Sequence, residues 1–410
     1  MDLFNNDLKF PTQNFLVNRD SRGSLRIVNI SCDWNDEEHA YEIIRITGIY
    51  NKTQTQQPSI FVRIGKVNRT VTEQTRLQYN HMLKEYRDKG YKDLNKNPEE
   101  YSEQELSTIA GEYKTTQEGL LKPMLAKQAD SVANKKIFDK EYYGSRKING
   151  VRCELWFDGK EIHAHSRGSI SYDLVMDHVC SHPLLIQLFK ANPSLIMDGE
   201  IYKYGWTLNK ISGICRSLKT AYDGEPLEFY FYDIVDTELS FTDRFKKMLK
   251  IKKLLNLSFD PTKVWQEDDL KIQFVPQDKM SGWDNMMTIH NKFISEGWEG
   301  LVIRLASAKY GPGKRTNDMI KIKVYKDAEY KIVGLSEGLR PEDMCFVMET
   351  EQGQQFNAKP LGDRSQKQWY REHLNELIGQ MATLKYFEMS GKEGSEIPQQ
   401  PVLMCIRNYE

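Results

Sequence analysis

Lys147 is the residue of this chain best placed to act as a nucleophile. It lies in the stretch YGSRKINGVRCELWFDGKEIHAH, residues 143–165, where apolar and polar residues alternate after the lysine. The alternation predicts a strand, and the Asp-Gly pair at 158–159 predicts a two-residue hairpin turn with residues 160–165 as the returning strand. Gly150 has no side chain that would block the close approach of a ligand to this turn. Most lysines before turns are merely solvated, so this stretch alone does not establish a catalytic lysine.

A lysine nucleophile needs neighbours that favour its free amine. At neutral pH an exposed lysine is almost entirely protonated and cannot attack phosphorus. Arg146 and Arg152 flank Lys147 in the sequence, and nearby cations favour the neutral amine. The segment IKIK would add Lys321 and Lys323, because alternation along a strand sends both lysines to one face and the isoleucines to the other. In isolation, IKIK is better explained as a half-exposed strand with solvated lysines.

Four further stretches follow Lys147 in a particular order. They are DGEIY at 198–202, FYFYD at 229–233, EGLVIR at 299–304 and IKIK at 320–323. Together with Lys147, these stretches resemble the ordered motifs of the covalent nucleotidyltransferases, which include ATP-dependent DNA ligases, RNA ligases and mRNA capping enzymes. The resemblance extends from about residue 122 to the C-terminus, and five motifs in this order are highly specific.

The resemblance implies a role for each basic residue. Lys147 would attack the α-phosphate of ATP and become a lysyl adenylate, with release of pyrophosphate. Lys321 and Lys323 would bind the α-phosphate and offset charge in the transition state. Arg152 and Arg167 match family positions that contact the nucleotide and the DNA 5′-phosphate, where a planar guanidinium can hold phosphate oxygens bidentately.

The resemblance also assigns two carboxylates and one aromatic ring. Glu200 matches the residue that binds the ribose or supports a metal, and Glu299 matches the one associated with the catalytic divalent ion. Mg²⁺ is implied, because carboxylate oxygens and a triphosphate make the site this ion prefers. Tyr232 takes the position that stacks on adenine. The structural alternatives are a hairpin residue for Glu200, a residue following a helix for Glu299 and core packing for Tyr232.

Two positions depart from the family pattern. Asn149 stands where the family usually has aspartate, so a negative charge beside Lys147 is lost, which would favour the neutral amine. Ser145 stands two residues before the lysine, where a glutamate often reads the adenine amino group. We expect Ser145 to contact the nucleotide, although the selection of ATP over GTP is then less firmly specified.

The N-terminal region carries a second basic cluster. Residues 41–50 and 59–67 are rich in β-branched and aromatic side chains and predict two strands. Thr70 and Glu73 have capping-box spacing, and Gly90 is placed to end the helix that they begin. The cluster beside this helix consists of Arg63, Lys66 and Arg69. The region partially resembles the WGR-like modules of some viral ligases, which implies contacts with DNA phosphates; a solvated charged surface is the alternative.

Composition sets the compartment and excludes several classes of protein. The chain has 410 residues, enough for two or three domains, and a net charge of −1, so a polyanion site must come from local clusters. Six scattered cysteines without a CxxC pair argue against a disulfide framework and a zinc site. We find no signal peptide and no apolar stretch of membrane-spanning length. These features predict a soluble protein of a reducing compartment, the cytoplasm or a eukaryotic nucleus, with no membrane partner.

The pattern of elements predicts an α+β protein with three domains. We expect an N-terminal DNA-binding module at 1–104, a linker at 105–120, a nucleotidyltransferase domain at 121–327 and an OB-fold β-barrel at 328–410. Residues 177–190 and 243–255 predict helices of the second domain. One further helix is expected between 366 and 378, among the short strands of the barrel.

The resemblance therefore implies an ATP-dependent DNA ligase of phage or viral type. It would use ATP and Mg²⁺, bind nicked duplex DNA and clamp it as a monomer. An RNA ligase shares the first five motifs but often lacks a C-terminal OB-fold, and a capping enzyme usually has a fuller final motif. The rival from another class is a non-catalytic nucleic-acid-binding protein, which adenylation by ATP would exclude.

Overall fold

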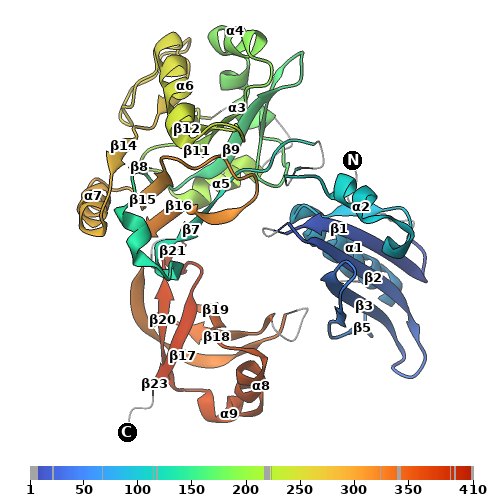
Figure 1. Cartoon of the computed structure of the whole chain (residues 1–410). Coiled ribbons are helices and arrows are strands. Elements are labelled where there is room, and N and C mark those ends of the chain that lie inside the picture. Colours follow the sequence, from blue (N-terminus) through green and yellow to red (C-terminus); the bar gives the residue numbers. More distant parts are fainter. Residues whose placement is uncertain are drawn as a thin grey trace. The chain divides into compact units, whose positions relative to one another are not determined.

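The computed structural model divides the chain into two units, residues 1–322 and 323–410 (Figure 1). The structure describes residues 8–20, 23–66, 68–113, 115–116, 119–216, 222, 224–323, 325–338, 343–387, 389–391 and 394–407. The prediction that the sequence lacks a signal peptide rests partly on residues 1–7, which lie outside the described residues. Within the described residues, no helix has the length and apolar character needed to cross a membrane.

The chain begins with an antiparallel sheet. Its strands are β1 Thr12–Arg19, β2 Leu25–Asn35, β3 Ala40–Ile49, β4 Gln54–Gln56, β5 Ile60–Val62 and β6 Lys92–Leu94. They lie in the order β4-β3-β2-β1-β6, and β5 also pairs with β3. β3 confirms the strand predicted at 41–50. The strand predicted at 59–67 is much shorter, because the chain turns after Val62.

Two helices cover opposite faces of this sheet. They are α1 Val71–Asp88 and α2 Glu103–Ala110. Leu16 packs in the cluster that contains α1, whereas its neighbour Val17 packs in the cluster that contains α2, as the two-residue period of a strand requires. The capping box of Thr70 and Glu73 is confirmed at the start of α1. Residues 105–110 of α2 fall in the predicted linker, and Leu106 is fully buried against the sheet.

The middle of the chain forms two five-stranded sheets around one core. The strands are β7 Leu125–Gln128, β8 Tyr142–Arg146, β9 Val151–Phe157, β10 Ile162–His165, β11 Met197–Tyr202, β12 Glu228–Ile234, β13 Ile272–Phe274, β14 Asp278–Met280, β15 Gly300–Leu305 and β16 Arg315–Lys323. One sheet has the order β10-β9-β11-β12-β13 and the other β14-β8-β15-β16-β7. Leu155 and Phe231 of the first sheet share one cluster with Ile303 and Ile320 of the second. The two sheets thus bury their apolar faces in the same core.

Five α-helices accompany these sheets. They are α3 Asp173–Cys180, α4 Pro183–Ala191, α5 Leu208–Arg216, α6 Phe241–Leu254 and α7 Trp283–Ser295, with 3₁₀ turns at Pro98–Glu100, Ala129–Ser131 and Lys135–Asp139 elsewhere in the unit. α6 confirms the helix predicted at 243–255. The single helix predicted at 177–190 is wrong, because Pro183 has no amide hydrogen to continue α3 and instead begins α4.

The predicted hairpin exists, but its turn is longer than expected. Phe157 of β9 pairs with Ile162 of β10, so four residues rather than two connect the strands. The side chain of Asp158 accepts hydrogen bonds from the backbone amides of Lys160 (2.7 Å) and Glu161 (2.8 Å), which holds this wider loop. The Asp-Gly pair alone does not show whether the aspartate side chain will accept hydrogen bonds from the backbone amides of the turn.

The second unit is a closed β-barrel. Its elements are β17 Lys326–Ser336, β18 Cys345–Glu349, β19 Gln355–Pro360, α8 Arg364–Glu372, α9 Leu374–Leu377, β20 Met381–Tyr386, β21 Met389–Ser390, β22 Ile397–Pro398 and β23 Val402–Arg407. The barrel closes in the order β17-β18-β19-β23-β20. Alternate residues of β18 and β20 enter its core, including Phe346, Met348, Ala382 and Leu384. The single helix expected here is interrupted at His373.

Candidate active site

Lys147 lies where β8 ends beside the start of β15. Its backbone amide donates to the carbonyl of Gly300 (2.9 Å), and its carbonyl accepts from the amide of Glu299 (3.2 Å). The side chain is 20% exposed, and its ammonium forms an ion pair with the carboxylate of Glu299, which is only 3% exposed. Two sheet strands therefore fix both partners of the pair, and the lysine keeps access to solvent.

Gly150 brings the loop after Lys147 against β11. A Cβ at this position would collide with the carbonyl oxygen of Ile201 and crowd Cγ of Glu200. The sequence predicted that this glycine leaves room for a ligand, whereas the structure gives it the role of close packing against another strand. This contact links the position of Lys147 to that of Glu200.

Glu200 is a buried carboxylate close to Lys147. Burial raises its pKa to about 7, although the charges of Lys147 and Arg152 act in the opposite direction. The hydroxyl of Tyr232 lies 3.0 Å from Oε2 of Glu200 and 3.1 Å from the carbonyl oxygen of Gly199. Tyr232 is 6% exposed, so its ring belongs largely to the wall of the site and its hydroxyl positions Glu200.

Arg152 is held against Tyr232 by a buried aspartate. Its guanidinium forms an ion pair with both carboxylate oxygens of Asp198, and its Cζ lies 5.1 Å from the centre of the Tyr232 ring. Tyr310 also donates to Asp198 (2.8 Å). The sequence predicted Arg152, but it assigned no role to Asp198 or Tyr310. Asp198 begins the DGEIY motif, whereas nothing in the sequence marks Tyr310 as its partner.

A second buried network supports Ser145. Arg304 donates to Oγ of Ser145 (3.1 Å), and its guanidinium lies 5.0 Å from the centre of the Tyr232 ring. Asp233 lies 3.6 Å from Nε of Arg304 and accepts two hydrogen bonds from Arg244 (2.8 and 3.2 Å). Asp233 and Arg304 end the FYFYD and EGLVIR motifs, but neither was predicted as a site residue. Ser145 is 1% exposed, and its hydroxyl oxygen already accepts this bond from Arg304.

The IKIK segment has the predicted alternation. Ile320 and Ile322 are buried, whereas Lys321 and Lys323 are only partly buried. A Cβ on Gly300 would collide with the carbonyl oxygen of Ile322, so β16 lies directly against the start of β15, where Gly300 follows Glu299 and accepts a hydrogen bond from Lys147. Lys321 is thus on a strand adjacent to the site. Lys323 begins the second unit, and its ammonium lies 4.0 Å from the centre of the Phe387 ring in that unit.

The expectation that flanking arginines surround Lys147 with positive charge is wrong. Arg146 pairs with Glu296 (2.8 Å), and its guanidinium lies 4.4 Å from the Phe293 ring centre. Arg152 is paired with Asp198, as described above. Both arginines are paired with carboxylates that lie far away in the sequence, so proximity in sequence was no guide to which charge lies against the amine. The group in contact with the amine is the carboxylate of Glu299.

The remaining predicted basic residues lie on the surface. Arg167 is exposed in a turn whose Ser166 hydroxyl accepts from the amides of Gly168 (3.2 Å) and Ile170 (2.9 Å). In the N-terminal sheet, Arg63 pairs with Glu38 and Arg69 donates to the carbonyl of Lys66 (3.3 Å) and to Gln74 (3.3 Å). In the part of the chain that the structure describes, Lys66 and Arg167 have no ion pair.

Glu200 and Glu299 are the two carboxylates available to a divalent ion. They lie close enough for the charge of Glu299 to act on Glu200, and both face Lys147. No group of three or more potential protein ligands is present among the described residues. Mg²⁺ commonly takes one or two carboxylates and completes its shell with water and substrate phosphate oxygens. The residues present therefore fit Mg²⁺ held jointly with a nucleotide.

Comparison with known proteins agrees with this arrangement of residues. Residues 123–323, which contain the whole cluster around Lys147, match the family model of the ATP dependent DNA ligase domain. The DNA ligase of African swine fever virus (strain Badajoz 1971 Vero-adapted) is 26% identical over 298 residues, which cover 68% of this chain and 67% of the viral protein.

Two solved structures share the fold. One, described as Pmar-Lig_Pre, has a TM-score of 0.59 at 16% identity and covers 76% of this chain and 73% of its own. The other, from a structure–function analysis of Lig E DNA ligases, has a TM-score of 0.52 at 19% identity and covers 70% of this chain and 99% of its own. Residues 123–323 of this chain therefore belong to the ATP-dependent DNA ligase family.

Proposed function

We propose that this protein seals nicks in duplex DNA through an adenylate carried on Lys147. Lys147 would take AMP from ATP, AMP would pass to the 5′-phosphate at a nick, and the 3′-hydroxyl would then displace AMP. The observation that carries the proposal is the pairing of Lys147 with Glu299 beside Glu200, at the junction of strands that also bear Arg152 and Tyr232. Transfer of AMP to the 5′-phosphate gives this unreactive group a good leaving group, AMP, for the final step.

In the first step the amine of Lys147 forms a bond to the α-phosphorus as the bond to pyrophosphate breaks. The ion pair with Glu299 must open first, and the ammonium must lose a proton before it can attack. Lys321 and Lys323 would neutralise the α-phosphate oxygens, where charge collects in the transition state. A cation bound by Glu299 would compete with the ammonium of Lys147 for that carboxylate and so help to open the ion pair.

Mg²⁺ would be held by Glu299 and Glu200. When bound, this ion neutralises phosphate charge and helps to orient the departing pyrophosphate. Glu200 has a second role in the proposal, as the group that binds the ribose. The hydrogen bond from Tyr232 to Glu200 supports it, because it fixes one carboxylate oxygen and leaves the other for the ligand.

The nucleotide would bind against Tyr232, Arg152 and Ser145. Adenine would stack on the part of the Tyr232 ring that is not covered, and Arg152 would reach phosphate or ribose oxygens with the guanidinium edge that Asp198 does not occupy. Ser145 would contact the base through its hydroxyl hydrogen, since its oxygen already accepts from Arg304.

DNA would be contacted by the catalytic domain and by the parts of the chain on either side of it. We propose domain limits of 1–104, 121–327 and 328–410, with the last domain an OB-fold. Five strands closing in the order first, second, third, fifth, fourth, with helices between the third and fourth, support that assignment. Arg167, Arg63, Lys66 and Arg69 would bind backbone phosphates, and a monomer would close around the duplex.

Labelling with ATP tests the first step directly. The purified chain is incubated with Mg²⁺ and ATP radiolabelled at the α-phosphate, and label that remains with the protein is mapped to a peptide. We expect acid-labile label on Lys147, none with Lys147→Arg, and release of label as AMP when nicked duplex DNA is added. Label on wild type and variant alike would refute the assignment of the nucleophile. If the protein became adenylated but nicked DNA did not release the label as AMP, RNA ends would replace nicked DNA as the proposed substrate.

A further inference from the structure

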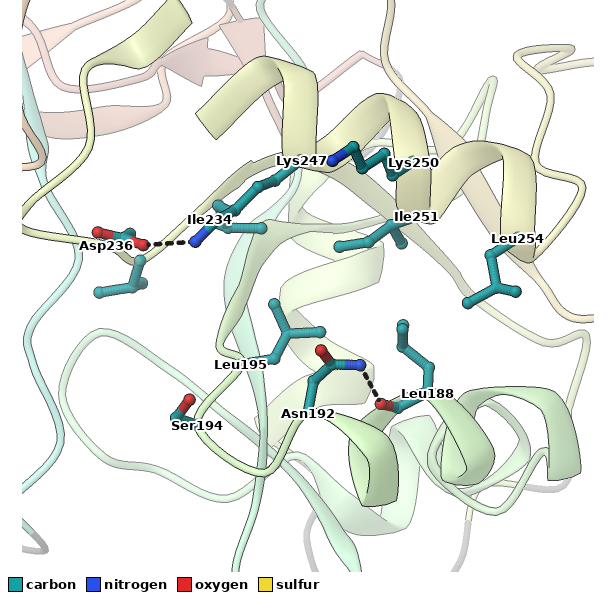
Figure 2. A pocket seen from close by; sticks show the side chains of 11 residues that line it. Leu188, Asn192, Ser194, Leu195, Ile234, Asp236, Lys247, Lys250, Ile251 and Leu254 are labelled. Atoms are coloured by element: carbon teal, nitrogen blue, oxygen red, sulfur yellow. Dashed lines mark hydrogen bonds and ion pairs between the residues drawn. The ribbon is translucent and has the colours of Figure 1, made fainter. Parts of the chain in front are cut away.

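A pocket outside the nucleotide site lies between α4, the end of β12 and α6 (Figure 2). Its volume is about 370 Å³, within the range of 300–1,000 Å³ typical of sites that bury a ligand. None of the residues that line it is among those assigned above to ATP, Mg²⁺ or DNA. A ligand of this pocket would therefore differ from the substrates of the sealing reaction.

One face of α6 forms a wall of the pocket. Lys247, Lys250, Ile251 and Leu254 follow the spacing i, i+3, i+4 and i+7, which places them along one side of a helix. Figure 2 shows these four side chains along α6 above the loop that follows α4. This face of α6 carries both lysines and apolar residues, and both kinds line the same cavity.

The pocket has an apolar part between α4 and α6. Leu188 of α4 and Ile234 of β12 are 4% and 3% exposed, and Leu195 and Ile251 lie beside them in the lining, which also includes the polar Asn192 and Ser194. Leu254 at the rim is 67% exposed, although it is as apolar as the buried residues. A large exposed leucine next to a concave apolar surface is typical of an interaction site rather than of a solvated surface.

The rim of the pocket is positively charged. Lys247 forms an ion pair with the only carboxylate of the lining, Asp236, at 3.0 Å. Among the described residues Lys250 has no ion pair, so no described carboxylate neutralises its charge. The rest of α6 adds Lys246, which pairs with Asp243 (2.8 Å), and further lysines at 252 and 253. Apolar residues below the charge of Lys250 are complementary to an apolar group that is flanked by negative charge.

We propose that this pocket binds a short acidic segment of a partner protein, with one bulky aliphatic or aromatic side chain inserted between α4 and α6. The apolar anchor would fill the cavity, and carboxylates beside it in the segment would pair with Lys250 and its neighbours on α6. DNA fits the surface less well, because phosphate contacts need cations but gain nothing from an apolar cavity. Burial of one large apolar anchor in such a pocket is the usual source of affinity at small interfaces.

Fluorescence anisotropy with a synthetic peptide tests this proposal. The probe is a short fluorescein-labelled peptide in which a central leucine and phenylalanine are flanked by aspartates, titrated with the purified full-length chain. We expect saturable binding that Lys250→Glu weakens roughly tenfold. Lys253→Glu makes the same charge reversal on α6 but outside the pocket lining. It should weaken binding less than about threefold.

The apolar part of the proposal has its own matched pair of variants. Leu254→Asp should abolish binding, whereas Leu249→Asp, on the same helix at 42% exposure and outside the lining, should not. Adenylation by ATP should be equal in all four variants, which excludes misfolding as the cause of lost binding. Absence of saturable binding, equal effects of the two charge reversals, or displacement of the peptide by nicked duplex DNA would each overturn the proposal.

Discussion

Glu154 is a buried carboxylate on β9, next to the strand that carries Asp198. It is fully buried, and its Oε2 lies 3.3 Å from Nε2 of His165 on β10. Burial raises the pKa of Glu154 to about 7, and the neighbouring His165 opposes this only in part. The carboxylate thus favours its protonated form in the folded protein. Because the unfolded chain has the ordinary lower pKa, ionisation of Glu154 costs stability as the pH rises from about 4.5 toward 7.

We expect Glu154→Gln to remove this pH-dependent loss. At pH 5 ionisation of Glu154 should cause little difference between the free energies of unfolding of the variant and wild type. At pH 8 the variant should be more stable than wild type by roughly 1–3 kcal/mol, because it has no charge to bury. Urea unfolding at both values measures the change. Glu161→Gln, which alters an exposed carboxylate on the same hairpin, is the control and should show no such dependence. A relative stability of Glu154→Gln that is the same at both pH values would contradict the expectation.

Local sequence pointed to Lys147 and Glu299 but not to the ion pairs around them. These two residues were predicted separately, and the structure joins them in one ion pair. The partners of Arg146 and Arg152 were not predictable, because Glu296 and Asp198 lie far away in the sequence. The end of α7 brings Glu296 to Arg146, and the pairing of β9 with β11 brings Asp198 to Arg152. Such ion pairs are a property of the tertiary fold, which periodicity along one strand does not contain.

The loop between β8 and β9 contains Lys147 and Gly150. Gly150 packs against β11 so closely that a Cβ would collide with the carbonyl of Ile201 and crowd Glu200. We expect Gly150→Ala to move this loop and to lower the rate of adenylation at least about tenfold, since misplacement of reacting groups by 1 Å can cost a hundredfold. Rapid-quench labelling with ATP measures the rate.

Gly213→Ala is the matched control for this change. Gly213 lies in helix α5, and a Cβ there would meet nothing within 4 Å. The substitution should therefore preserve adenylation and stabilise the helix by up to about 1 kcal/mol. Equal rates for wild type, Gly150→Ala and Gly213→Ala would show that the close contact with β11 does not position Lys147.

Elements with a strong local signal were predicted, and those decided by context were not. The capping box of α1, the alternation of β16 and the basic helix α6 all follow from short patterns. The strand β12 is buried along its whole length, because it lies inside the first sheet and under α6, and its apolar run reflects this. By contrast, α2 went unpredicted because a polar stretch conceals its buried Leu106, which only the sheet explains.

A near-neutral chain must concentrate charge to bind a polyanion. The net charge is −1, and several of the predicted basic residues are already neutralised within the structure, as Arg63 is by Glu38. Lys66 has no ion pair among the described residues. If the N-terminal sheet binds DNA as proposed, the residue without an internal partner should contribute more to phosphate binding than the paired one.

We therefore expect Lys66→Gln to weaken binding to nicked duplex DNA and to reduce the slope of log affinity against log salt by about one. Arg63→Gln should have a smaller effect, because Glu38 already offsets the charge that it removes. Titrations at several salt concentrations with Lys147→Ala, which prevents turnover, measure both slopes. Identical slopes for all proteins would argue that this turn does not touch DNA.

The two units meet in the sequence inside one motif. The sequence predicted the mixed α+β class and a β-barrel after IKIK, and the closed order of β17 to β23 agrees with it. The boundary falls at Lys323, inside that motif, so β16 carries Lys321 in one unit and ends at the first residue of the other. In the proposed reaction both units act on one substrate.

Sealing of a 5′-phosphorylated nick in duplex DNA with ATP and Mg²⁺ is the decisive test of the proposed function. Wild type is compared with Lys147→Ala, and a nick that carries a 5′-hydroxyl is the substrate control. We expect a continuous strand only with wild type and the phosphorylated nick. Sealing by Lys147→Ala, or failure of an adenylated wild-type protein to seal the phosphorylated nick, would contradict it.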